Sequence, residues 1–215
     1  MRKTRDYCFT CLRTPENCYC EHVRRFDPKI RFVILLHSRE NQKHIATGRL
    51  AHLCVERSEV ILGYDNSRED RVNELLVEPG TLKAILYPGE TSINLSVLTP
   101  IARATLFPPE KELVLFVVDG TWTTARKTMS NCENLRALPR LSFDVPAPSR
   151  IRLRQQPAPH CITTAEAIHH TIELLGSARG FDTGSRVHDA LLASQEAMVS
   201  KQAALAKLHY PAFWG

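Results

Sequence analysis

The feature that most restricts the fold is an uninterrupted apolar run near the middle of the chain. Residues Leu113–Val118 read Leu-Val-Leu-Phe-Val-Val, and this run is the strongest strand candidate in the sequence. A strand without polar alternation suits a position that is covered on both faces, which is typical of a parallel sheet. The run therefore predicts a parallel strand inside an α/β fold.

The other expected elements alternate between strands and helices along the chain. Before the central run we expect a strand at Phe32–Leu36, a helix within 44–57, a strand at Glu59–Leu62, a helix at Arg68–Val77 with Ser67 as its N-cap, and a strand at Leu82–Tyr87. After it we expect a helix at 121–134, a Pro- and Arg-rich loop at 139–160 with at most a short strand, and helices at 164–176 and 186–208. This order predicts an α/β fold with a mostly parallel sheet flanked by helices.

Length and composition exclude several classes of protein. The 215 residues suffice for one substantial core, with 43% hydrophobic and 24% charged residues, so disorder is not expected. The net charge of +5 is compatible with a polyanionic partner but is not specific for one. No apolar run approaches the roughly 20 residues that cross a bilayer. Because no apolar segment follows the charged N-terminus, we expect neither a secretory signal nor a membrane anchor, and predict a cytoplasmic protein.

Four of the seven cysteines crowd into thirteen residues near the N-terminus. They are Cys8, Cys11, Cys18 and Cys20. The odd total and the clustering argue against a disulfide framework and for a metal, because a Cys-x-x-Cys turn brings two sulfurs to one ion. We favour structural zinc, with His22 as a spare ligand. An iron–sulfur cluster is the main rival, and unrelated free thiols are the third alternative. A closed four-sulfur site leaves no open position for catalysis.

The central apolar run ends in the turn Asp119-Gly120-Thr121-Trp122. Ligands of parallel α/β sheets bind beyond the carboxyl ends of the strands, so this position favours a functional role for the turn. Gly120 lets the backbone approach a ligand closely, and Thr121 can cap the helix that follows. A purely structural interpretation is equally good on these residues alone: Asp119 and Thr121 cap the helix, and Trp122 belongs to the core.

Two further motifs and several basic residues shift this balance towards function. Leu86-Tyr87-Pro88-Gly89 ends a second strand with a tight turn, and Thr163-Thr164-Ala165-Glu166 opens a late helix with a capping box. Basic residues close to these motifs in the sequence could bind phosphates, although solvated surface charge is their ordinary role. They are Arg126, Lys127, Arg150, Arg152 and Arg154.

Taken together, these motifs resemble the DTW-domain family of tRNA-uridine aminocarboxypropyltransferases. The matching pieces are the four cysteines, Thr47-Gly48-Arg49-Leu50, Leu86-Tyr87-Pro88-Gly89, Asp119-Gly120-Thr121-Trp122 with Ala125-Arg126-Lys127, and Thr163-Thr164-Ala165-Glu166. They occur in the family's order from residue 8 to about residue 167, which is most of the chain. One departure is Ala46, which stands where the family has asparagine.

The resemblance implies a transfer of the 3-amino-3-carboxypropyl group from S-adenosylmethionine to N3 of a tRNA uridine in the variable loop, with release of methylthioadenosine. It also implies kinship with the SPOUT methyltransferases, whose cofactor site lies in a knotted C-terminal half. The expected partner is tRNA, with no obligate protein partner. The expected domains are a metal-binding segment at 1–27 and a catalytic domain at 28–215.

From these motifs, and from the activity that the resemblance implies, we expect the following site residues. The catalytic residues are Asp119, Thr121 and Trp122. The residues that bind S-adenosylmethionine are Leu86, Tyr87, Pro88, Gly89, Asp119, Gly120, Trp122, Thr163, Thr164, Ala165 and Glu166. The residues that bind RNA are Arg49, Arg126, Lys127, Arg150, Arg152 and Arg154, and the metal ligands are Cys8, Cys11, Cys18 and Cys20.

The role of Asp119 stays open between two possibilities. Uridine N3 must lose a proton before it can attack, and Asp119 could accept that proton or orient the base. A carboxylate with the ordinary pKa of about 3.9 is a weak base for this step. Two other functions remain as alternatives: a SPOUT-like RNA methyltransferase, and a non-catalytic zinc protein that binds RNA.

Overall fold

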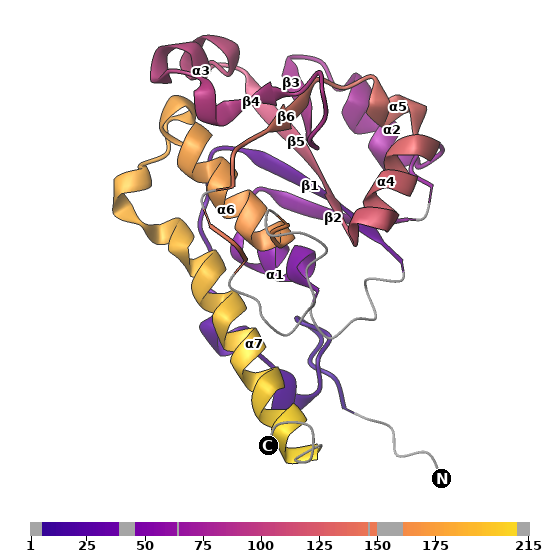
Figure 1. Ribbon diagram of the computed structural model, residues 1–215, viewed down its shortest axis with the longest axis vertical. Coiled ribbons are helices and arrows are strands. Elements are labelled where there is room, and N and C mark those ends of the chain that lie inside the picture. Colours follow the sequence, from indigo (N-terminus) through magenta and orange to yellow (C-terminus); the bar gives the residue numbers. More distant parts are fainter. Residues whose placement is uncertain (1–5, 39–45, 64, 146, 150–160, 210–215) are drawn as a thin grey trace.

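A six-stranded parallel sheet is the centre of the computed structural model, which describes residues 6–38, 46–63, 65–145, 147–149 and 161–209 (Figure 1). The strands are β1 (Arg31–His37), β2 (Ser58–Gly63), β3 (Thr81–Leu86), β4 (Ile93–Asn94), β5 (Glu112–Asp119) and β6 (Arg140–Ser142). Their order is β2-β1-β5-β3-β6-β4, and every neighbouring pair is parallel. The α/β prediction is confirmed, and the sheet is parallel throughout.

Strand β5 lies between β1 and β3, where both of its faces are covered. Leu115 aligns with Phe32 of β1 and with Ala84 of β3. The side chains of β5 alternate between two hydrophobic clusters, with Leu115 in one and Phe116 in the other. This double burial explains why the apolar run of β5 has no polar interruption.

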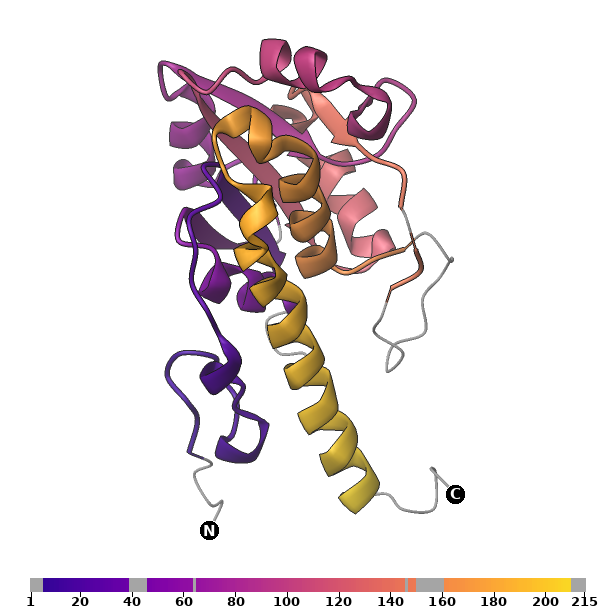
Figure 2. The ribbon, with the colours of Figure 1, turned by 90° about the vertical axis from the view of Figure 1, so that its left-hand side faces the viewer.

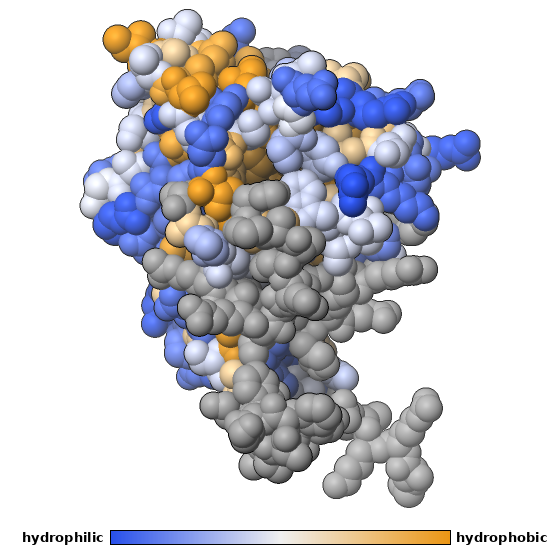
Figure 3. Space-filling model, viewed as in Figure 1, coloured by the Kyte–Doolittle hydropathy of each residue, from blue (hydrophilic) through white to orange (hydrophobic). Residues whose placement is uncertain are grey.

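Helices form a layer on each face of the sheet (Figures 1 and 2). One layer contains α1 (Thr47–Cys54), α6 (Thr164–Leu175) and α7 (Ala190–His209), and the other contains α2 (Asp70–Val77), α4 (Trp122–Asn131) and α5 (Glu133–Arg136). The short helix α3 (Pro100–Leu106) lies at the upper end of the molecule and carries the exposed apolar side chains Ile101 and Leu106 (Figure 3). None of the helices in the described ranges has the length and apolarity that a membrane crossing requires.

Several predicted boundaries were wrong for identifiable local reasons. Ser67 is not the N-cap of α2, because its hydroxyl donates to Asp65 Oδ1 at 2.6 Å and the helix begins at Asp70. The predicted helix at 121–134 is two helices, interrupted by the extended backbone of Cys132. Helix α7 begins at Ala190, after the left-handed conformation of Arg186 (φ 57°) and a 3-10 turn. Strand β4 and helix α3 were not predicted.

The cysteine-rich segment packs against the main body. Its Cys11 and Tyr19 are fully buried and belong to the same hydrophobic cluster as α1, α6 and α7. The proposed domain boundary at residue 27 stays a prediction. The C-terminal knot also stays a prediction, because residues 150–160, which lie between β6 and α6, are outside the described residues.

Candidate active site and metal centre

A cavity of about 440 Å³ opens at the carboxyl ends of β3, β5 and β6, beside the first turn of α6. Its lining residues are Leu86, Tyr87, Pro88, Val117, Val118, Gly120, Trp122, Ala125, Leu141, Ser142, Phe143, Asp144, Val145, Ile162, Thr163, Thr164 and Ala167. The lining is mostly apolar with a few hydroxyls. Small-molecule sites typically have this character and a volume of roughly 300–1,000 Å³.

The two strand-end motifs and the motif at the start of α6 all contribute to this cavity. Leu86, Tyr87 and Pro88 come from the end of β3, Gly120 and Trp122 from the turn after β5, and Thr163 and Thr164 from the start of α6. The structure therefore brings together seven of the residues predicted to bind the cofactor.

Two aromatic rings stand on one side of the cavity. The ring centroids of Tyr87 and Trp122 are 6.3 Å apart, and the Arg140 guanidinium lies 5.8 Å from the centroid of the Tyr87 ring. Burial raises the pKa of Tyr87, so its hydroxyl stays protonated at neutral pH. Trp122 is only partly buried, so its assignment to the core was wrong. The two rings offer flat apolar surfaces to a planar ligand.

Other predicted residues serve the helix starts instead of lining the cavity. Thr121 Oγ1 accepts a hydrogen bond from the Thr124 amide at 3.2 Å, and thus caps α4. Glu166 accepts from the amide of Thr163 at 2.8 Å and completes the predicted capping box of α6. Capping accounts for both residues without a role in binding.

Gly89 and Ala165 also lie outside the cavity lining. Gly89 is exposed in the turn after β3, where its carbonyl accepts from the Ser92 hydroxyl at 2.6 Å. Ala165 is fully buried in the hydrophobic cluster under α6. Contact with a ligand in the described cavity is therefore not evident for either residue.

Asp119 lies between α1 and α6, beside the cavity rather than in its lining. It is the last residue of β5 and is only 7% exposed, and its Oδ1 accepts a short hydrogen bond from the Thr164 hydroxyl. A Cβ added to Gly48 of α1 would lie 2.5 Å from Asp119 Oδ2. The glycine of the Thr47-Gly48-Arg49 motif therefore leaves the space that the Asp119 carboxylate occupies, a role the sequence had not suggested.

Residues at and after β6 form a wall that sequence reasoning missed. Ser142, Phe143 and Asp144 line the cavity. The side-chain amide of Asn94 donates a hydrogen bond from Nδ2 to Asp144 Oδ1 at 2.9 Å. Among the described lining residues Asp144 alone carries a charge. The proline content of 139–160 favoured a loop with at most a short strand, although Arg140-Leu141-Ser142 does alternate as a short strand would.

The predicted RNA-binding residues are only partly placed. Arg126 and Lys127 are exposed on α4, whose first residue, Trp122, lines the cavity. Arg49 is partly buried on α1, next to Gly48. Arg150, Arg152 and Arg154 lie outside the described residues. The structure therefore offers two exposed cations on a helix beside the cavity mouth.

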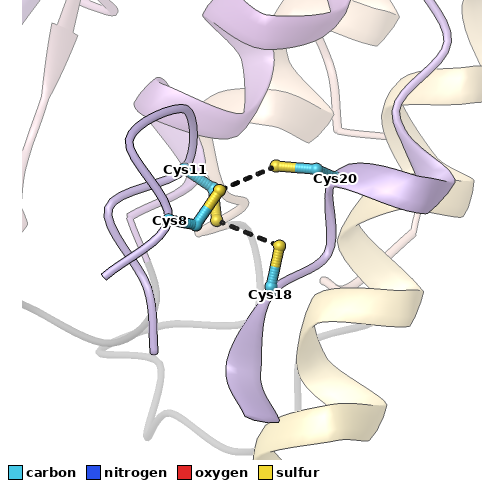
Figure 4. Close-up of side chains that lie close together, drawn as sticks. All are labelled: Cys8, Cys11, Cys18 and Cys20. Atoms are coloured by element: carbon cyan, nitrogen blue, oxygen red, sulfur yellow. Dashed lines mark hydrogen bonds between the residues drawn. The ribbon is translucent and has the colours of Figure 1, made fainter. Parts of the chain in front are cut away.

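The four clustered cysteines converge on one point (Figure 4). Cys8 Sγ lies 3.7 Å from Cys20 Sγ, Cys11 Sγ lies 3.7 Å from Cys18 Sγ, and all four sulfurs are within 4.8 Å of one another. Four thiolates at the usual Zn–S distance of about 2.3 Å stand about 3.8 Å apart, so the spacing fits one tetrahedral ion. Thiolates held by different irons of a cluster would be spread further apart.

The local chemistry of the cluster also suits a metal. Amide hydrogen bonds from Cys11 and Thr10 lower the pKa of Cys8 to about 6, which favours its thiolate. Burial instead raises the pKa of Cys11 and of Cys20, whose thiolates need a bound cation to stabilise them. His22 is not part of the group, since its Nε2 lies 3.3 Å from Glu21 Oε1 instead. The spare ligand is therefore not needed.

Helix α7 connects this cluster with the cavity. Lys201 Nζ donates to the carbonyl of Cys18 at 2.6 Å, and the Ser194 hydroxyl donates to the carbonyl of His22 at 2.9 Å. In the same helix, Gln195 Oε1 accepts from the hydroxyl of Thr163, a residue of the cavity wall, at 2.8 Å. One helix thus touches both the cysteine-rich segment and the start of α6.

In a second group of potential metal ligands, an arginine contacts both carboxylates. His169, Glu173, His188 and Asp189 place their ligand atoms within 4.8 Å of one another. His169 Nε2 lies 2.8 Å from Asp189 Oδ1, and His188 Nε2 lies 2.9 Å from Glu173 Oε1. Arg186 contacts both carboxylates, at 2.5 and 2.6 Å. Both carboxylates are already engaged by Arg186 and by the histidine rings, so this group forms a network that joins α6 to the start of α7.

The buried histidines predict a loss of stability in mild acid. Burial lowers the pKa of His52, His169 and His170. In the unfolded chain each returns to a pKa of about 6.5, so the unfolded state binds more protons and the free energy of unfolding falls below that pH. We expect the melting temperature to fall between pH 7 and pH 5 by a few degrees, about 2–4 °C for each 1 kcal/mol lost.

Thermal unfolding followed by circular dichroism across this pH range measures the effect. His169→Gln keeps a donor for Asp189 but cannot titrate, so its melting temperature should depend less on pH. An unchanged pH dependence in this variant would show that His169 does not contribute.

Comparisons with known proteins identify relatives along almost the whole chain. A model of the DTW domain family matches residues 5–203. Two proteins named tRNA-uridine aminocarboxypropyltransferase 2, from Macaca fascicularis and Mus musculus, are each 24% identical to the chain, over 93% and 92% of it. The protein of the same name from Drosophila melanogaster is 24% identical over 80% of the chain. The chain spans 64% of the length of the first two relatives. No solved structure matches it significantly.

Proposed function

The chain belongs to the DTW domain family, and from this membership we propose that it transfers the 3-amino-3-carboxypropyl group of S-adenosylmethionine to a uridine of tRNA. The relatives named tRNA-uridine aminocarboxypropyltransferase 2 support this reaction class. The observation that carries the proposal is the cavity at the carboxyl ends of β3, β5 and β6, where the two strand-end motifs and the motif at the start of α6 meet. We further propose N3 as the acceptor atom and the variable loop as its location.

The cavity has the character that a nucleoside sulfonium requires. Tyr87 and Trp122 provide flat surfaces for the adenine ring. Backbone groups of the turns at 86–88 and 163–164, with the Thr163 and Ser142 hydroxyls, can hydrogen-bond to the base and the ribose. Asp144 places a negative charge in the lining, which complements the cationic sulfonium and ammonium groups.

The proposed transfer balances without a redox partner. Uridine N3 gives up its proton to solvent water and forms a bond to the γ-carbon of the amino acid arm, while the bond from that carbon to sulfur breaks. The electron pair stays on sulfur, and neutral methylthioadenosine leaves. Since the methyl carbon is less hindered, the protein must select the γ-carbon by geometry, with the methyl group buried and the arm directed towards the RNA.

Asp119 suits the role of a positioning residue better than that of a free base. Its carboxylate is tied to the Thr164 hydroxyl and packed against Gly48. Through Thr164 it fixes a residue of the cavity wall. We propose that Asp119 orders the start of α6 at the site where the arm meets the uridine, and that any direct contact with the base comes second.

The deciding experiment combines the protein with unmodified tRNA and S-adenosylmethionine and analyses the nucleosides by mass spectrometry. We expect an aminocarboxypropyl uridine and an equivalent amount of methylthioadenosine. A methylated nucleoside with S-adenosylhomocysteine would identify a methyltransferase instead. Binding of tRNA without any product or any binding of S-adenosylmethionine would identify a non-catalytic RNA-binding protein.

We also propose that the four-cysteine group holds structural zinc. The donor set and the 3.7 Å sulfur spacing fit one tetrahedral ion with no open coordination position. The ion would therefore organise the N-terminal segment and take no part in the transfer. Elemental analysis of the purified protein should give about one zinc per chain, whereas iron with visible absorbance would indicate a cluster.

A further inference from the structure

The turn between the first two cysteines exposes aromatic side chains to solvent. Phe9, inside the Cys8–Cys11 turn, is 98% exposed, and Tyr7 beside it is 53% exposed. Aromatic rings are normally buried, because they contribute large apolar areas to the core. Two exposed rings on either side of Cys8 therefore suggest a surface that is covered by a partner.

The backbone of this turn is held firmly, so the rings are not on a loose tail. The Cys8 amide donates to the Arg13 carbonyl at 2.7 Å, and the Leu12 amide donates to the Cys8 carbonyl at 2.8 Å. The sulfurs of Cys8 and Cys11 are also fixed in the four-cysteine group. A rigid turn can present an aromatic ring without losing much conformational entropy when a partner binds.

The small size of the exposed aromatic surface and the positive charge of the segment indicate which kind of partner binds there. A stable protein interface takes about 20–30 residues on each side, whereas one nucleobase stacks on one ring. Residues 1–27 contain six lysines or arginines and four aspartates or glutamates, which is a net charge of +2, and the whole chain has a net charge of +5. Both features favour a polyanion over an apolar protein surface.

We propose that Phe9 and Tyr7 form a stacking platform for an unpaired nucleotide of the tRNA substrate. The inference rests on the proposed function and deepens it. The cysteine-rich segment would bind a looped-out base while the transfer takes place at the cavity. Stacking on aromatic rings is how proteins commonly hold unpaired bases, and it tolerates any base because each has a π-face. The paired stems of the tRNA would not use this platform.

The test measures binding of unmodified tRNA to the full chain and to Phe9→Ala. Phe9→Ala should weaken binding roughly tenfold, within the range found for the loss of one base stack. The KM for tRNA should rise while kcat and the affinity for S-adenosylmethionine stay the same. Phe9→Tyr should restore binding, and both variants should keep their metal.

A matched control is Ile101→Ala, which removes an 81% exposed apolar side chain from α3, at the opposite end of the molecule (Figure 1). This variant should bind tRNA like the unaltered chain. Equal tRNA affinity and KM for Phe9→Ala and the unaltered chain would overturn the platform, as would a change in oligomeric state without a change in RNA binding. A Phe9-dependent affinity for tRNA in a protein that forms no product would instead refute the proposed function alone.

Discussion

Replacement of Gly48 by alanine should reduce kcat about 100-fold while the protein stays folded, because a misplacement near 1 Å commonly costs that much. The added Cβ would lie 2.5 Å from Asp119 Oδ2 and 2.7 Å from its Cγ. Asp119 cannot move aside freely, since its other oxygen is bound by Thr164. Steady-state kinetics with tRNA and S-adenosylmethionine measures the loss.

Helix propensity, ligand affinity and a matched control variant separate this effect from unfolding. Alanine is a better helix former than glycine, so α1 itself should not be weakened. The folded variant should still bind S-adenosylmethionine, and its affinity should fall less than kcat does, because Asp119 reaches the cavity wall only through Thr164. Gly184→Ala is the control, as an added Cβ there meets only the Asp182 side chain, at 3.1 Å. Activity within threefold of the unaltered chain in Gly48→Ala would refute the importance of the Asp119 position.

Asp119→Asn distinguishes charge from shape at the same position. Asparagine keeps the volume and an oxygen that can accept from Thr164, but it cannot take the uridine proton. A modest loss of kcat would support a positioning role, and a loss as large as that of Asp119→Ala would support a role for the negative charge.

The sequence predicted the strands well because their signal is local. The run Leu113–Val118 is enough to predict its own environment, because an uninterrupted apolar run is typical of a strand that is buried on both faces. The capping box at Thr163 is local in the same way, and its geometry is confirmed. By contrast, the predicted start of the last helix at Arg186 was wrong. Arg186 has a left-handed backbone and forms ion pairs with Glu173 and Asp189. Such tertiary contacts leave no pattern in the sequence.

The site was harder to predict because it depends on contacts between residues that are far apart in the sequence. Gly48 and Asp119 are 71 positions apart in the chain, and only the packing of α1 against the end of β5 brings them together. The wall at Ser142–Asp144 became visible only once β6 was paired between β3 and β4. The motifs predicted which turns lie together in the fold, but they did not predict which side chains of these turns line the cavity.

Removal of the metal is expected to have the largest effect on stability. Cys11 and Tyr19 are fully buried in the main hydrophobic cluster, so release of the cysteine segment would expose core. Loss of a buried aromatic side chain typically costs about 3–5 kcal/mol, which lowers the melting temperature of a chain this long by on the order of 10 °C. Chelation, or the substitution Cys11→Ser, should produce this shift in a thermal unfolding experiment.

The same treatment should weaken binding of S-adenosylmethionine, although the metal lies outside the cavity. Helix α7 holds the cysteine segment through Ser194 and Lys201, and the neighbouring Gln195 holds Thr163 in the cavity wall. Gln195→Ala should reproduce the loss of affinity with the metal still bound. Cys132→Ser, a buried cysteine on the other face of the sheet, should change neither metal content nor affinity. A metal-free chain with an unaltered melting temperature would refute a structural metal, and one with a lower melting temperature but full affinity would refute the connection through α7.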